Sequence, residues 1–201
     1  MKLNAYSFLT AIKAVLPFAP ENNVRYCLNG VHLLGTKNGF FIEATDGYTA
    51  ARVKIDAQLD GHLDLIIPHG FCKEIAKLKV PVRERDNLEL GLDYYDLKAI
   101  VSLSGKTIEV EAIDDKYVDL THVLIAPPVG KPSGRRVFNA EYMARAATSA
   151  SMLANHCALV GGSAATDNFV FEVPTAHGKF AMISEPAIFA ICPMRLSRAK
   201  R

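Results

Sequence analysis

The expected order of secondary-structure elements repeats three times along the chain, and this repeat constrains the fold more than any other feature. In the first block a short strand precedes a helix and three further strands, with expected ranges 1–5, 8–16, 24–34, 40–44 and 49–55. Apolar residues spaced three and four apart predict the helix, with Ser7 as its N-cap and Pro17 at its end. Alternating apolar residues between turn residues predict the strands.

The same order returns twice. In the second block the expected strand, helix and three strands cover residues 63–67, 71–78, 88–92, 97–103 and 107–112. In the third block they cover residues 136–139, 141–153, 169–173, 179–183 and 188–192, while residues 154–168 follow no clear pattern. Prolines and glycines between residues 113 and 135 favour an extended linker. The sequence therefore predicts an α+β fold built from three βαβββ units.

These units are expected to pair. A βαβββ unit with one amphipathic helix cannot bury its sheet and its helix alone. The first two units then form a complete domain over residues 1–122, and residues 123–135 form a linker. Residues 136–201 form a half domain that has no partner within the chain.

Composition narrows the class of protein without naming one. The chain has 201 residues, half of them hydrophobic, and a net charge of only +2. Basic residues gather at positions 131–136 and 195–201, where they could bind a polyanion or form an ordinary solvated terminus. The four cysteines form no CxxC motif, which predicts reduced thiols in a cytoplasmic protein. We find no signal peptide and no apolar run of the ~20 residues that a membrane span needs.

The sequence carries no catalytic signature. Glycine-rich phosphate loops, nucleophile elbows and zinc-protease motifs are absent, and none of the six histidines stands at metal-ligand spacing from a cysteine or aspartate. Asp114, Asp115 and Asp119 form a small acidic cluster, which is more typical of a solvated strand exit than of a metal site. The sequence therefore predicts a binding protein rather than an enzyme, with no metal and no cofactor.

Several segments carry a more specific pattern. Residues 25–30 read R-Y-C-L-N-G, residues 44–47 read A-T-D-G and residues 193–196 read P-M-R-L. Together with residues 118–124 and 138–142, and in this order, they resemble the bacterial replicative sliding clamp, the β subunit of DNA polymerase III. Domains of that family are each built from two βαβββ units. By this resemblance, residues 1–122 are similar to its complete middle domain, and residues 136–201 to the second half of its last domain.

The resemblance implies a function without catalysis. A clamp encircles double-stranded DNA, slides without reading sequence and tethers a DNA polymerase. In the family, a hydrophobic pocket between the middle and last domains accepts short peptides from the polymerase and the clamp loader. The positions that match this pocket are Leu28, Thr45, Gly47, Tyr48, Val118, His122, Val123, Cys192, Met194 and Arg195. The same residues could instead simply pack the joint between units.

This sequence departs from the family pattern at the pocket. The usual H-R-L after the Asp-Gly turn is Tyr48-Thr49-Ala50 here, and Val118 and His122 replace a proline and an arginine. A smaller side chain and a lost cation predict an altered peptide preference.

The resemblance also implies that helices line the DNA and present cations to phosphates. The DNA-facing candidates are Lys13, Arg25, Lys73, Lys77 and Arg145. A solvated helix face is equally compatible with these cations.

A shortened clamp needs several copies to close a ring. The family's ring contains about twelve βαβββ units, so a chain of three units predicts a homotetramer with alternating two-fold contacts. The shortening suggests a protein of a phage or another mobile element. The alternative is a clamp-like interaction protein or inhibitor that binds clamp partners, or the host clamp, without encircling DNA.

Overall fold

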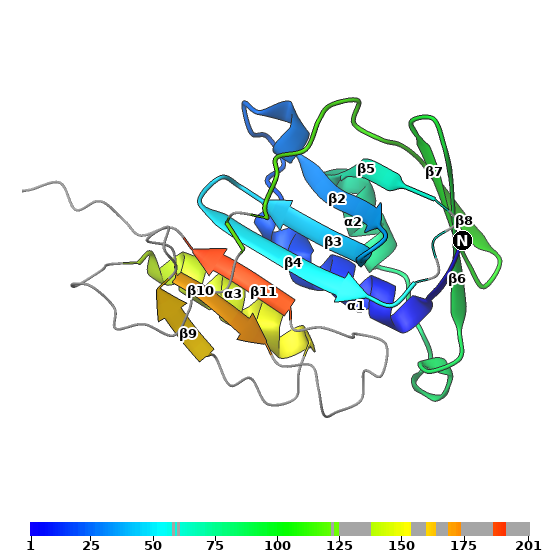
Figure 1. Cartoon of the computed structure of the whole chain (residues 1–201). Helices are drawn as coiled ribbons and strands as arrows, with labels where there is room; N and C mark the ends of the chain where they lie inside the picture. The colour runs from blue at the N-terminus through cyan, green and yellow to red at the C-terminus, as the bar shows by residue number, and fades with distance from the viewer. Residues whose placement is uncertain are drawn as a thin grey trace, which may run out of the picture.

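The computed structural model describes residues 1–57, 59, 61–121, 123–124, 138–153, 160–163, 169–173 and 187–191 (Figure 1). The first unit contains β1 (Lys2–Asn4), α1 (Ala5–Val15), β2 (Gly30–Thr36), β3 (Gly39–Thr45) and β4 (Thr49–Ile55). The second contains β5 (Leu63–Pro68), α2 (His69–Ala76), β6 (Glu89–Tyr95), β7 (Lys98–Leu103) and β8 (Lys106–Glu111). The third contains α3 (Ala140–Leu153), β9 (Val160–Ser163), β10 (Phe169–Val173) and β11 (Ala187–Ile191). Three short 3₁₀ helices complete the described elements: η1 (Leu16–Phe18), η2 (Tyr26–Leu28) and η3 (Val82–Glu84).

Helix α1 begins earlier than the sequence predicts. The side-chain oxygen of Asn4 accepts the N–H of Ser7 at 2.9 Å, so Asn4 is the N-cap and the prediction of Ser7 is wrong. Asn4 is the last residue of strand β1, and the helix starts directly after it, which places Ser7 inside the first helical turn. The helix ends where Pro17 enters the 3₁₀ turn η1.

The first two units exchange their first strands. Strand β1 pairs with β6 and strand β5 pairs with β2, both antiparallel. One sheet therefore has the order β1-β6-β7-β8, and the other begins β5-β2-β3-β4. This exchange interlocks the two units into a single body with a shared core.

The third unit continues the larger sheet. Strand β11 pairs antiparallel with β4, with Ala190 opposite Ala50 and Phe189 opposite Ala51. The sheet therefore has seven strands in the order β5-β2-β3-β4-β11-β10-β9. Ala50 and Ala51 of β4 are small and leave room for the buried ring of Phe189. The centroid of this ring lies 5.5 Å from that of Phe18.

The three helices α1, α2 and α3 cover one face of the seven-stranded sheet (Figure 1). The nearly continuous burial of α1 follows from its position between the sheet and its two neighbouring helices. Phe8 of α1 stacks on Phe40 of β3, with ring centroids 6.5 Å apart, in the main core. None of the helices in the described part of the chain combines the length and apolar character that a bilayer crossing requires.

The strand expected over residues 24–34 is only partly correct. Its first part forms η2, and strand β2 begins at Gly30. The side chain of Asn29 bonds the backbone of Asn23, and the carbonyl of Asn29 accepts the N–H of His69, so the chain turns before it extends. A side chain at Gly30 would collide with the carbonyl oxygen of Ile67, which is why glycine stands where β2 meets β5.

The other elements follow the expected order with small shifts at their ends. Strand β4 has the predicted bounds, and helix α3 begins one residue before its predicted start. Residues 138 and 139 do not form the strand expected at 136–139, and residues 136 and 137 lie outside the described residues. The strand expected at 179–183 also lies outside them, whereas β9 occupies part of the stretch that shows no clear sequence pattern.

Candidate peptide-binding pocket

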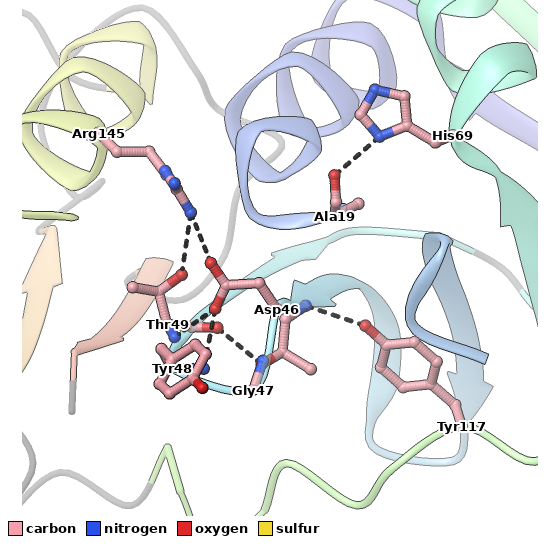
Figure 2. Close-up of polar contacts among 9 residues, drawn as sticks. Ala19, Asp46, Gly47, Tyr48, Thr49, His69, Tyr117 and Arg145 are labelled. Atoms are coloured by element: carbon pink, nitrogen blue, oxygen red, sulfur yellow. Dashed lines mark hydrogen bonds and ion pairs between the residues drawn. The ribbon is translucent and has the colours of Figure 1, made fainter. Parts of the chain in front are cut away.

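The turn between β3 and β4 is held by its own side chains. The Asp46 carboxylate accepts the backbone N–H groups of Tyr48 and Thr49 at 2.9 and 2.7 Å. The hydroxyl of Thr45 donates to the carbonyl of Thr49 at 2.6 Å and accepts the N–H of Gly47 at 3.1 Å. Gly47 has φ +89°, which a side chain would strain. These bonds give the turn a fixed shape (Figure 2).

Arg145 ties this turn to the third unit. Its guanidinium reaches from α3 to the second carboxylate oxygen of Asp46 at 2.7 Å and to the hydroxyl of Thr49 at 3.3 Å (Figure 2). Both partners of the ion pair are largely shielded from solvent. Charge-assisted bonds in such surroundings are stronger than exposed ones, so the turn and α3 are held in one arrangement.

Tyr117 supports the turn from the opposite side. Its buried hydroxyl accepts the N–H of Thr45 at 3.0 Å, and its ring stacks on His32 at 4.5 Å. Burial raises the pKa of Tyr117 well above its usual range, and the nearby Glu43 carboxylate adds to the shift. The phenol is therefore neutral at physiological pH and fixes the chain just before Val118.

A buried polar network lies behind Tyr117. The two ring nitrogens of His32 face the carboxylates of Glu43 and Asp64, at 2.9 and 2.8 Å. The second carboxylate oxygen of Glu43 accepts the Nε–H of Arg52 at 2.6 Å. The network joins β2, β3, β4 and β5, so it stiffens the sheet on which Tyr117 rests.

A cavity of about 170 Å³ opens between the turn, the segment after Tyr117 and strand β11. Its wall is mostly apolar, with one acid and one cation at the rim. The lining residues are Arg25, Leu28, Thr45, Gly47, Tyr48, Thr49, Ala50, Val118, Asp119, Leu120, Val123 and Ala190. An apolar hollow with a few fixed polar groups suits the capture of one or two side chains of a peptide.

An aromatic pair extends this surface toward α3. Tyr48 keeps 63% of its surface exposed and stacks on Tyr142, with ring centroids 6.4 Å apart. The guanidinium of Arg145 lies 5.2 Å from the centre of the Tyr142 ring. Partial burial raises the pKa of Tyr142, with a smaller effect from Asp46. Exposed aromatic rings held in place are typical of sites that bind other proteins.

The cavity gathers six of the residues that the sequence proposes for the pocket: Leu28, Thr45, Gly47, Tyr48, Val118 and Val123. The other four, His122, Cys192, Met194 and Arg195, lie outside the described residues. The sequence reasoning missed Ala190 and Tyr142, which reach the site through the β4–β11 pairing and the packing of α3. Neither contact leaves a local signal in the sequence.

The proposed DNA-facing cations lie in three different surroundings. Lys13, Lys73 and Lys77 are exposed on α1 and at α2, and Lys73 pairs with Glu21. Arg25 lies at the rim of the cavity, off the helix layer. Arg145 was expected to face DNA, but its guanidinium is bound to Asp46 and so is not a free cation on the helix surface.

No cluster of three or more potential metal ligands occurs among the described residues. The acidic residues Asp114 and Asp115 are exposed at the end of the second unit, as a solvated strand exit would have them. The prediction that the chain needs no metal stays a prediction.

Comparison with known proteins gives one consistent answer at the level of the fold. No family model and no curated protein matches the sequence. The DNA polymerase sliding clamp of Pseudomonas aeruginosa matches the structure with a TM-score of 0.74 at 17% identity, over 98% of this chain and 66% of the clamp chain. The DNA polymerase III β subunit of Borrelia burgdorferi matches with a TM-score of 0.78 at 13% identity, over 98% of this chain and 64% of its own. The sliding clamp of Bacillus subtilis matches with a TM-score of 0.70 at 13% identity, over 98% of this chain and 64% of the clamp chain. This chain thus spans just under two thirds of the length of the clamps that it matches.

Proposed function

Because the chain has the fold of the bacterial DNA polymerase III β sliding clamp, we propose that it is a non-enzymatic processivity clamp. It encircles double-stranded DNA in the cytoplasm and tethers a DNA polymerase that carries a short clamp-binding peptide. The observation that carries this proposal is the apolar cavity between the Asp46 turn, the 118–124 segment and β11. This part of the surface is built by the joint between the complete domain (residues 1–122) and the half domain (residues 136–201).

The cavity is suited to peptide capture because its walls are fixed before any peptide arrives. Asp46, Arg145 and Tyr117 hold the turn from two sides, so little ordering is needed on binding. Arg25 and Asp119 at the rim offer one charge of each sign to the flanks of a peptide. We therefore expect an apolar side chain to enter the cavity and polar residues to flank it.

A charge placed at the cavity wall tests this proposal. Val118→Glu should lower the affinity for clamp-binding peptides by at least tenfold, because a carboxylate would be desolvated in an apolar wall. Fluorescence anisotropy with labelled C-terminal peptides of bacterial replicative polymerases measures the effect. Val82→Glu is the matched control, since Val82 is 74% exposed and lies in η3, away from the cavity. Equal binding by both variants would place the peptide elsewhere.

Ring closure would use sheet edges that a single chain leaves open. By the exchange of first strands, β4 and β8 occupy equivalent edges of the two sheets, and β4 is covered by β11. Strand β8 is the last strand of its sheet, with Ile108 and Val110 turned toward the core. We propose that β8 pairs antiparallel with β8 of a second copy, and that half domains meet at the other contact. Four copies joined in this way complete a ring of about twelve units.

The helix layer would face the DNA. Lys13 and Lys73, from α1 and α2, line one groove with Met152 of α3. Lys77 is exposed at the end of α2. Weak, salt-dependent contacts of such lysines with phosphates would hold the duplex without stopping it from sliding.

A second candidate function is a clamp-like interaction protein that binds clamp partners without encircling DNA. It is favoured by the cavity, which a single chain lines without a second copy. Retention on a nicked circular plasmid separates the two functions. A ring that encircles DNA remains bound to the circle and is lost when the plasmid is cut once, whereas an interaction protein behaves identically on both forms.

A further inference from the structure

One carboxylate lies between two basic side chains beside the helix layer. Glu21, in the loop after η1, accepts a hydrogen bond from the ammonium of Lys73, and the same oxygen lies 3.4 Å from Nε2 of His69. The other ring nitrogen, Nδ1, lies 2.8 Å from the carbonyl oxygen of Ala19 (Figure 2). Because a carbonyl only accepts, Nδ1 carries a proton, so Nε2 can donate to the Glu21 oxygen or to a phosphate only when the ring carries a second proton.

The cluster is accessible from solvent on two sides. Lys73 and His69 line the apolar groove that also contains Lys13. The same two residues line a more polar hollow of about 660 Å³, together with Glu21 and Asn22. The side chains of Lys73 and Glu21 are 51% and 56% exposed, so neither is buried by the other.

The chemistry of the cluster suits a tetrahedral oxyanion. The Lys73 ammonium and Nε2 of His69 converge on one carboxylate oxygen; His69 is the first residue of α2, and Lys73 lies in its last turn. Glu21 already occupies the point where the two nitrogens converge, and the adjacent Lys73, followed by His69, lowers the pKa of its carboxyl. Glu21 is therefore charged and acts as an internal anion.

We propose that Lys73 and His69 form a phosphate-binding site that Glu21 occupies in the free protein, and that a phosphate group displaces the carboxylate. For duplex DNA as the source of that phosphate, the inference rests on the proposed clamp function. Displacement is feasible because solvent-exposed ion pairs are weak. Glu21 thereby lowers the affinity of the site for phosphates, and a low affinity suits a protein that must slide along DNA.

The inference predicts a gain of binding on removal of the acid. Glu21→Gln frees Lys73 for a phosphate, so the affinity for a 30-base-pair duplex should rise about three- to tenfold. One additional phosphate contact should steepen the dependence of log K on log salt by about 0.9. Glu74→Gln is the matched control, because it removes the same charge from an exposed position next to Lys73 on α2. Glu74→Gln should change affinity only slightly, through net charge.

A second measurement tests the site without DNA. Inorganic phosphate is titrated into the wild type, Glu21→Gln and Glu74→Gln while NMR follows the Cε1–H signal of His69, assigned with His69→Gln. Saturable shifts at several-fold lower phosphate in Glu21→Gln than in the other two support the inference. Identical titrations in all three overturn it, whatever the duplex does. Tighter duplex binding by Glu21→Gln than by Glu74→Gln identifies the nucleic acid backbone as the source of the phosphate group that displaces Glu21. A phosphate response in Glu21→Gln with no duplex binding by any protein would keep the phosphate site and remove DNA from the proposed function.

Discussion

Replacing Tyr117 with phenylalanine removes one hydroxyl from the base of the candidate pocket. That hydroxyl accepts the buried N–H of Thr45 at 3.0 Å. The phenylalanine ring keeps the stacking on His32, so the change isolates the hydrogen bond. A buried donor left without its acceptor costs about 1–3 kcal/mol. We expect Tyr117→Phe to lower the free energy of unfolding by that amount.

Urea unfolding at one fixed protein concentration measures the change, since assembly would make stability depend on concentration. Tyr95→Phe is the control, because Tyr95 is 51% exposed at the end of β6 and should change stability by no more than about 0.5 kcal/mol. If the free energy of unfolding falls with urea concentration at the same slope in the variant as in the wild type, the unfolded state is unaffected. A Tyr117→Phe variant as stable as the control would refute the assigned role of the hydroxyl in holding the turn.

Three further outcomes follow from the structure. Arg145→Met should destabilise the fold by about 1–3 kcal/mol in urea unfolding, because it leaves one oxygen of the shielded Asp46 carboxylate without its cation; a loss below 0.5 kcal/mol would count against the tie to α3. Burial raises the pKa of Cys72 to about 12, so iodoacetamide at pH 8 should leave Cys72 unmodified until urea unfolds the chain, as peptide mass spectrometry would show. Because the pKa of Tyr117 is raised in the fold, its contribution to stability should be constant below about pH 10 and fall above it. Tyr117→Phe should flatten that alkaline decline in unfolding experiments, and an unchanged decline would contradict the assignment.

Much of the fold could be predicted from local patterns. Alternation and turn residues gave the bounds of β4, and the three-fold order of elements predicted the three units. The exchange of β1 and β5 between the first two units could not be predicted, because pairing between strands that are far apart in the sequence leaves no periodic signal. The turn at residues 26–28 was missed because the side chain of Asn29 overrides an apolar pattern typical of a strand.

The candidate site was predicted in part for the same reason. Residues next to one another in the Asp46 turn were found as a motif, since their geometry is set locally. The contribution of α3 was not found. The sequence predicts Arg145 to be an exposed cation on a helix. Only the tertiary fold shows that it pairs with Asp46, 99 residues away in the sequence. Long-range ion pairs of this kind have no local signature.

The number of copies in solution tests the central claim most directly. Light scattering coupled to size-exclusion chromatography at micromolar concentration measures the mass independently of shape. A ring closed by chains of three βαβββ units should give four times the chain mass of 21.9 kDa. A stable species of one chain mass across that concentration range would contradict the ring, and with it the proposal that this protein encircles DNA.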